Sequence, residues 1–280
     1  MQEAEELRAE HPGCGVEKMY DTLEPPFIGR DRFVDFFMDL GFRVKYPKNY
    51  TRTTFSVNYN YPNLIEGMLV SNINQVVQSD ITYFCLKDNF YYIIFIIDVF
   101  SKRIVGSKVS NHMRAIANLE ALKQLIKLRG FDNLLGLIHH SDRGTQYGSN
   151  LYINTLNRAG IHISMCLNAQ ENAYAERVNG IIKNEYLKLW KINSFYSLKR
   201  KLAKAVNHYN FKRPHRHLPN KMSPVQFENA FANANYDKEH FELIFAKENF
   251  IKRNLQKQYF HFFNSLFQNA NGLFCPILLN

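Results

Sequence analysis

The sequence predicts an α/β fold in which helices flank a mixed, five-stranded sheet and a small helical region precedes it. Three consecutive segments after residue 76 have the apolar pattern of strands, and helix-like and strand-like segments alternate after them. Residues 1–45 instead show the spacing of short amphipathic helices. Strands in a row, followed by alternating helices and strands, indicate a single sheet covered on its faces by helices.

The N-terminal region is predicted to form a helical unit. One helix is expected over 17–23, and a second begins near Gly29. In the second helix, apolar residues recur from Phe33 to Leu40 at the i, i+3, i+4 and i+7 positions of one face, and Gly41 is placed to end it. Two short helices joined by a turn that contains proline and glycine fit either a helix-turn-helix or a plain helical hairpin.

The remaining elements are predicted from residue 46 onward. Residues 46–75 are rich in Tyr, Asn, Pro and Thr and show little periodicity, which is typical of a linker. Strands are expected at 78–86, 90–99, 103–109, 134–139 and 161–166, and helices at 112–128, 150–158 and 173–187. The strongly apolar run 90–99 is typical of a buried central strand. The ribonuclease H-like fold has this order of elements, so the main unit is predicted to span 76–230 with a basic helical extension, before a tail of unknown role over 231–280.

Positive charge is concentrated in one part of the chain. The formal net charge is +10, and residues 186–227 contain ten cations and no acid, so this segment carries the whole excess. The cations are Lys188, Lys191, Lys199, Arg200, Lys201, Lys204, Lys212, Arg213, Arg216 and Lys221. A segregated basic segment indicates a polyanionic partner, either nucleic acid or an anionic membrane, although a solvated basic helix face gives the same pattern.

Cysteine spacing and hydropathy restrict the compartment. The four cysteines are widely spaced and lack the CxxC pair of a zinc site, so a reducing compartment is expected. The polar, acidic N-terminus does not resemble a signal peptide, and no apolar run reaches the roughly 18 residues of a membrane span. The sequence therefore predicts a cytoplasmic protein with no membrane partner.

Three acids stand at predicted element ends where folding can bring them together. Asp80 lies in the first strand, Asp142 just after the fourth, and Glu176 in the first turns of the last helix. Carboxylate oxygens are the ligands that Mg²⁺ and Mn²⁺ prefer, and two such ions about 4 Å apart can stabilise the attacking and leaving oxygens of a displacement at phosphorus. Glu176, Gly180 and Lys183 share one helix face, which suits a helix lying along a phosphate backbone.

Other acids compete for the same role. Asp98 follows the apolar strand and is interpreted as a cap for the turn at Ser101, with approach to the site as the alternative. Glu171 precedes the last helix, where its charge can complement the helix dipole. Glu185 lies beyond Glu176 on the same broad face of that helix and is a second rival.

Two adjacent histidines and a cysteine suggest other chemistries. His139 and His140 are neighbours on a predicted strand and point to opposite faces, so they are not expected to share a metal ion. Cys166 has no base placed beside it and is interpreted as a core residue. Neither observation competes with an oxygen-ligand site.

Several segments occur in an order that characterises one family. They are SDITYF, IIFIIDVFSKRIVG, HHSDRGTQYGSN, ENAYAERVNGIIKNEYL and YNFKRPHRHLPNKMSPVQF, which together lie within residues 76–228. They resemble the insertion-sequence transposases with a DDE active site, and most of all the second-reading-frame product (orfB) of the IS-three family. Upstream, HPGCGVEKMYDTL, IGRDRF and DLGFRVK resemble the helix-turn-helix region of that family.

The resemblance implies an integrase catalytic core in which Asp80, Asp142 and Glu176 are catalytic and bind metal. It implies two Mg²⁺ (or Mn²⁺) ions, cleavage of DNA at the ends of the element, and transfer of the freed 3′-hydroxyl to a target strand. It implies DNA contacts by Lys183, Arg143, Arg213 and His215. Family members assemble as multimers on DNA and often act fused to the upstream-frame (orfA) product, so a nucleoid-associated homo-oligomer is expected.

Two alternatives stay open. The 33 residues between Asp142 and Glu176 are slightly fewer than the family usually has, which fits a catalytically decayed copy that still binds DNA. A ribonuclease H-like nuclease would use the same acids on RNA–DNA hybrids. It would hydrolyse the hybrid without joining strands, so the choice of substrate separates it from a transposase.

Overall fold

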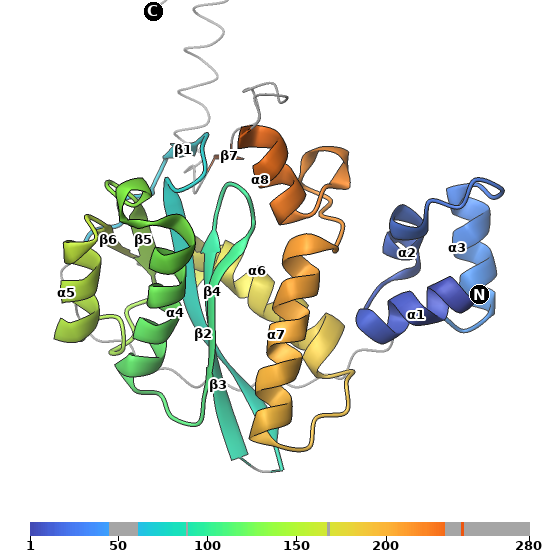
Figure 1. The fold of residues 1–280 in the computed structure, drawn as a ribbon, viewed down its shortest axis with the longest axis horizontal. Helices are drawn as coiled ribbons and strands as arrows, with labels where there is room; N and C mark the ends of the chain where they lie inside the picture. Colours follow the sequence, from blue (N-terminus) through green and yellow to red (C-terminus); the bar gives the residue numbers. More distant parts are fainter. Residues whose placement is uncertain (45–60, 88, 167–168, 233–241, 244–280) are drawn as a thin grey trace, which may run out of the picture.

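The computed structural model describes residues 1–44, 61–87, 89–166, 169–232 and 242–243. In these residues, a mixed sheet carries helices on both faces, and three short helices form a small unit beside it (Figure 1). The predicted α/β class is therefore confirmed. Among the described helices, none combines the length and the hydropathy that crossing a bilayer requires.

The main sheet of the described residues has five strands. They are β2 (Val76–Leu86), β3 (Asn89–Asp98), β4 (Ile104–Ser110), β5 (Ile138–Ser141) and β6 (His162–Met165). Their order is β4-β3-β2-β5-β6, with β3 antiparallel to both neighbours and β5 parallel to both of its neighbours. The apolar run 90–99 forms the buried strand β3, but the central position predicted for it belongs to β2, because β5 and β6 extend the sheet from the other edge of β2.

Helices cover both faces of this sheet (Figure 1). α4 (Ala115–Arg129) and α5 (Asn150–Arg158) lie on one face, and α6 (Ala173–Ile181), its π-helical continuation η3 (Ile182–Leu187) and α7 (Phe195–Phe211) lie on the other. Successive side chains of β3 point to opposite faces of the sheet, so Ile94 and Ile96 pack toward α4 whereas Phe95 packs toward α6 and α7. Gly106 of β4 allows α4 to pack closely, since an added Cβ would lie 2.4 Å from the carbonyl oxygen of Ala121.

Short 3-10 turns adjust several predicted boundaries. η1 (Phe131–Asn133) precedes β5, η2 (Ala169–Asn172) precedes α6, and η4 (Pro219–Lys221) precedes α8 (Pro224–Ala232). The fourth strand begins at Ile138 rather than at 134, because η1 and the positive φ (82°) of Gly136 bend the chain before it. The helix predicted over 173–187 forms, but its second half widens into the π-helical turn η3.

Residues 61–75 and α8 close one end of the sheet. Ile65 and Val70 are completely buried and share a cluster with Phe100 and with Phe227 of α8. β1 (Leu69–Val70) also pairs with β7 (Glu242–Leu243). The linker predicted for 46–75 is corrected accordingly, because residues 61–75 bury apolar side chains in the core. Its remainder, 46–60, lies outside the described residues, as does most of the predicted tail 231–280.

The N-terminal unit consists of α1 (Gln2–Glu10), α2 (Val16–Leu23) and α3 (Arg30–Asp39). The two helices predicted here are confirmed as α2 and α3, and Gly41 follows α3 with a positive φ of 81°. Phe33 and Phe37 are buried in the core of the unit, whereas Phe36 and Leu40 of the predicted apolar face are 52% and 48% exposed. The unit therefore buries a narrower face of α3 than the pattern predicts, and its helix-turn-helix role stays a prediction.

Candidate active site

The strand register places Asp80 and Asp142 side by side. β2 and β5 run parallel with Ser79 paired to Ser141, so Asp80 of β2 and Asp142, the first residue after β5, come next in the two segments. Burial, followed by the negative charges of Asp142 and Glu176, raises the pKa of Asp80 to about 8. Burial also raises the pKa of Asp142, although the backbone N–H of Gly144 donates to its Oδ1 at 3.0 Å. This pair resists full ionisation in the absence of a cation.

Glu176 lies in the first turn of α6, and residues of β2 hold the start of that helix. The side chain of Gln78 donates to the carbonyl of Glu171 at 2.9 Å and accepts from the backbone N–H of Tyr174 at 3.0 Å. Asn172 donates to the carbonyl of Ser79 at 2.9 Å. These bonds fix the beginning of α6 beside Asp80, and partial burial raises the pKa of Glu176.

The side chain of Glu176 is nevertheless exposed. Within the described residues, no group of three or more His, Cys, Asp or Glu side chains is close enough to hold a metal ion. The structure thus brings two of the predicted acids together, and the third acts on Asp80 through its charge. A triad made of all three stays a prediction.

Asn179 and Lys183 also face the acid-bearing strand from α6 and η3. Asn179 donates from Nδ2 to Oδ2 of Asp80 at 2.5 Å, and Lys183 donates from Nζ to Oγ1 of Thr82 at 3.0 Å. Lys183 lies 4.7 Å from the centroid of the Tyr83 ring, and burial lowers its pKa. Asn179 is a site residue that was not predicted from the sequence, although its position three residues after Glu176 places it on the same helix face.

The donors near Asp80 suit a hard cation. Asp80 and Asp142 supply carboxylate oxygens, and the Oδ1 of Asn179 is a buried oxygen with no hydrogen-bond partner in the described part of the chain. Mg²⁺ and Mn²⁺ prefer such oxygen ligands. A divalent cation would also stabilise the ionised form of the acid pair, whose protonation now reflects burial and mutual repulsion. The residues present therefore fit the metal that the resemblance implies.

The competing groups have other roles. Asp98 caps the turn as expected, since its Oδ1 accepts from the backbone N–H of Ser101 and its Oδ2 from that of Asn74, both at 2.9 Å. His139 bonds to Tyr152 and His140 to Ser164, at 2.9 and 2.8 Å. Burial lowers the pKa of His139 to about 3 and that of His140 to about 4, so both rings are neutral near pH 7. Burial raises the pKa of the Cys166 thiol to about 12, which agrees with a core residue.

Glu185 does not share the position of Glu176. Its carboxylate is nearly buried and contacts Nζ of Lys18 at 2.5 Å, Nε2 of His11 at 2.7 Å and the guanidinium of Arg213 at 2.9 and 3.0 Å. Burial alone would raise the pKa of Glu185, but the His11 hydrogen bond and the Arg213 charge hold it far below its ordinary value. Glu185 is thus an ion-pair partner of the N-terminal unit, and the expectation that it rivals Glu176 is wrong.

The predicted DNA contacts lie at different depths. Arg143 is half-buried just after Asp142, and its Nε has no hydrogen-bond partner within the described residues. Arg213 and His215 are 5% and 6% exposed, and the ring of His215 bonds to the hydroxyl of Tyr209 at 2.9 Å. The two buried side chains are used inside the protein, so a DNA contact by either would require rearrangement and stays a prediction.

A mixed sheet of this order, with one acid on the central strand and another after its parallel neighbour, defines the ribonuclease H-like class. Two family models, each described as an integrase core domain, match residues 71–170 and 158–224. A transposase for insertion sequence element IS904 of Lactococcus lactis is 33% identical over 192 residues, which cover 67% of this chain and 74% of that protein. A 31 kDa protein of insertion element IS600 from Shigella sonnei is 31% identical over 211 residues, with 73% and 76% covered. The chain belongs to the insertion-sequence transposases with an integrase core.

Other relatives match a smaller share of their length. The transposase assigned to IS986/IS6110 of Mycobacterium tuberculosis is 32% identical over 164 residues, which cover 56% of this chain and 59% of that protein. Among solved structures, the HTLV-2 integrase catalytic core domain in complex with magnesium gives a TM-score of 0.43 at 21% identity, with 59% of this chain and 98% of that chain covered.

Proposed function

We propose that this chain cleaves DNA at the ends of an insertion sequence and transfers the freed 3′-hydroxyl to a target strand. The observation that carries the proposal is the pair formed by Asp80 of β2 and Asp142, which directly follows the parallel neighbour β5; burial raises the pKa of both carboxyls. Polar residues of β2 anchor the helix that carries Glu176 beside this pair. Family membership supports the same chemistry.

Each residue near the acid pair has a proposed role. Asp80, Asp142 and Glu176 would hold two Mg²⁺ or Mn²⁺ ions, and metal bound there would stabilise the charge that develops on the attacking and leaving oxygens at phosphorus. Asn179 orients the carboxylate of Asp80 through its 2.5 Å hydrogen bond. Lys183 of η3, which donates to the hydroxyl of Thr82, supplies positive charge for a phosphate beside the acids.

The rest of the molecule would position DNA. Arg143 follows Asp142, and its Nε has no hydrogen-bond partner among the residues that the structure describes, so it is placed to meet a phosphate near the acid pair. The N-terminal helices would read the element ends as a helix-turn-helix. The protein would act as a homo-oligomer on DNA, on the nucleoid in the cytoplasm, alone or with the upstream-frame product.

Strand cleavage and joining by purified protein test this proposal. A labelled duplex carrying the element's own terminal repeats is incubated with Mg²⁺ or Mn²⁺, and the products are separated on a denaturing gel. Asp142→Asn should abolish both cleavage and joining while DNA binding persists. Asp132→Asn, the same change at an exposed residue of η1, should leave both reactions intact. Full activity of Asp142→Asn would refute the assignment.

A DNA-binding protein without catalysis is the second candidate. The observation that favours it is that Glu176 is exposed and forms no three-ligand cluster within the described residues. Salt-sensitive binding of the element ends, combined with no metal-dependent cleavage by the wild-type protein, would support it. Hydrolysis of an RNA–DNA hybrid without joining would instead indicate a ribonuclease H-like nuclease.

A further inference from the structure

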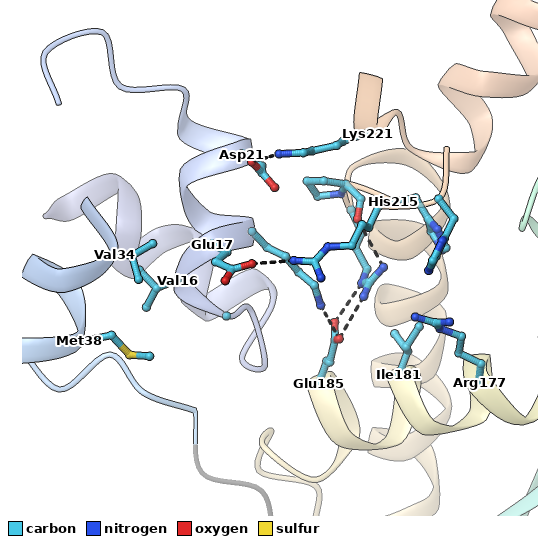
Figure 2. A pocket seen from close by; sticks show the side chains of 16 residues that line it. Val16, Glu17, Asp21, Val34, Met38, Arg177, Ile181, Glu185, His215 and Lys221 are labelled. Atoms are coloured by element: carbon cyan, nitrogen blue, oxygen red, sulfur yellow. Dashed lines mark hydrogen bonds and ion pairs between the residues drawn. The ribbon is translucent and has the colours of Figure 1, made fainter. Parts of the chain in front are cut away.

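Acids of the N-terminal helices cover part of the basic segment. Three acids of α1 and α2 each pair with a cation of residues 212–221, at the end of α7 and in the loop that follows it. Figure 2 shows Glu17 and Asp21 of α2 facing this loop. Glu10 pairs with Lys212 at 3.0 Å, Glu17 with Arg216 at 2.7 Å, and Asp21 with Lys221. The segment predicted to attract a polyanion is therefore partly neutralised from within the chain.

Glu185 anchors the same contact from the core side. His11 and Lys18 reach its carboxylate from the N-terminal unit, and Arg213 reaches it from the basic loop. The carboxylate is nearly buried and stays ionised, because these three partners keep its pKa far below the ordinary value. Removing the N-terminal helices would leave the buried Glu185 carboxylate with fewer partners, which is unfavourable. The need to satisfy this charge therefore favours one defined geometry for the contact.

Gly13 makes this geometry possible. Its backbone N–H donates to the carbonyl oxygen of Glu185 at 2.5 Å, and an added Cβ would lie 2.1 Å from Cα of Glu185. Gly15, two residues later, has no atom within 4 Å of the equivalent position. Close approach, rather than backbone conformation, therefore requires glycine at position 13, because Gly13 is not among the glycines with positive φ.

The contact is ionic in character and includes open space. A cavity of about 430 Å³ separates Val16, Val34 and Met38 on the N-terminal side from Arg177 and Ile181 of α6 (Figure 2). The side chains of Glu17 and Arg216 are 58% and 78% exposed. Exposed ion pairs stabilise weakly and are screened by salt, so a competing polyanion can displace them.

We infer that residues 1–44 occupy the 212–221 surface as an internal competitor of DNA, and that DNA phosphates displace Glu10, Glu17 and Asp21 from Lys212, Arg216 and Lys221. The inference rests on the proposed function for its DNA partner. Docked, the N-terminal helices hold their own acids against the basic surface. Displaced, they free three cations for the phosphate backbone and become available to a second contact on DNA.

Trp190 provides a reporter of docking. It is the single tryptophan of the chain, and its indole Nε1 donates to the carbonyl oxygen of Ala9 in the N-terminal unit at 3.3 Å. Gly13→Ala should undock the unit and shift the Trp190 emission to longer wavelength without any change in charge. Gly15→Ala is the matched control and should leave the emission unchanged.

The same two variants are then titrated with a short fluorescein-labelled DNA duplex. If the docked form makes up about nine tenths of the free protein, undocking raises the affinity for DNA about tenfold. Gly13→Ala should therefore bind the duplex more tightly than the wild type, and Gly15→Ala should bind like the wild type. A shifted emission with unchanged or weaker DNA binding would overturn the competition, and an unshifted emission would overturn the docking.

A second pair of variants separates competition from net charge and does not depend on the steric change. The double variant Glu17→Gln, Asp21→Asn removes two interface acids. The control, Glu3→Gln with Glu5→Gln, removes two acids of α1 that are outside the three ion pairs and changes the net charge by the same amount. The first pair should raise the DNA affinity more than the second, and equal effects would contradict the inference. If neither wild type nor variants bind DNA, the proposed function fails and the competition with it, whereas the Trp190 emission still reports whether the unit docks.

Discussion

Replacing Asp80 with asparagine should remove the pH dependence that this carboxyl gives to stability. The pKa of Asp80 is raised to about 8, above its ordinary value of 3.8, by burial and by the charge of Asp142. Between these two pH values the native state holds a proton that the unfolded state has lost. The free energy of unfolding of the metal-free protein should therefore fall as the pH rises, by about 1.4 kcal/mol per pH unit.

The size of the effect between pH 6 and pH 8 follows from the same values. The slope of the free energy of unfolding against pH has its full value near pH 6 and half that value at about pH 8. The loss of stability attributable to Asp80 over this range is therefore about 2 kcal/mol. Asp80→Asn has no carboxyl to ionise at this position and should not show this loss. Mg²⁺ at pH 8 should restore stability to the wild type, because a bound cation favours the ionised acids, and should do so much less in the variant.

Urea unfolding in EDTA, at both pH values and with both proteins, measures this difference directly. Taking the difference between the two proteins removes the contributions of every other titrating group that the substitution leaves unchanged. Asp132→Asn, at an exposed position, should keep the wild-type dependence. Equal losses of stability in wild type and Asp80→Asn would show that Asp80 is ionised at neutral pH and would remove the electrostatic case for a cation at this site.

Three further outcomes are expected. Gly180→Ala should stabilise α6 by about 1 kcal/mol in thermal or urea unfolding, because nothing lies within 4 Å of the added Cβ. The same variant should slow strand joining if DNA approaches this helix face, and an unchanged rate of joining would contradict that approach. Glu228→Gln should cost about 3 kcal/mol in urea unfolding, since the carboxylate is buried against Arg129, and a loss below about 1 kcal/mol would show that the pair contributes little. Iodoacetamide at pH 7 should label exposed Cys85 in the native protein and spare Cys166, as read by mass spectrometry, and equal labelling would refute the burial of Cys166.

The sequence predicts the acid pair well because local patterns determine it. Asp80 sits inside a segment that reads as a strand, and Asp142 follows a strand whose parallel pairing with β2 the order of elements implies. The same reasoning identifies the helix that carries Glu176. The periodicity of apolar residues indicates which face of each helix and strand is buried, and the buried faces determine how the strands and helices pack.

Side-chain partners across long sequence distances do not follow from such patterns. The sequence shows Arg213 as one of ten cations, but its guanidinium is buried against Glu185, a contact that depends on how α7 returns toward η3. Gly13 and His11 reach the same carboxylate or its backbone from the N-terminal unit. Each partner looks like an ordinary surface residue until tertiary packing brings the three segments together. The approach of Asn179 to Asp80 could have been predicted from the sequence, because helical spacing places Asn179 on the same face as Glu176.

The position of the basic segment in the fold matters more for DNA binding than its charge count. α7 presents Lys199 and Lys204 to solvent, whereas Lys212, Arg216 and Lys221 face acids of α1 and α2. Exposed charges are screened beyond about 8 Å at physiological ionic strength, so paired cations add little to long-range attraction while those acids stay in place. If the proposed competition operates, a DNA duplex would be drawn first toward α7, and the loop would add its contacts after the acids have moved. Since each phosphate contact steepens the salt dependence of binding by about 0.9 log unit per log unit of salt, that dependence reports how many of the loop cations are in use.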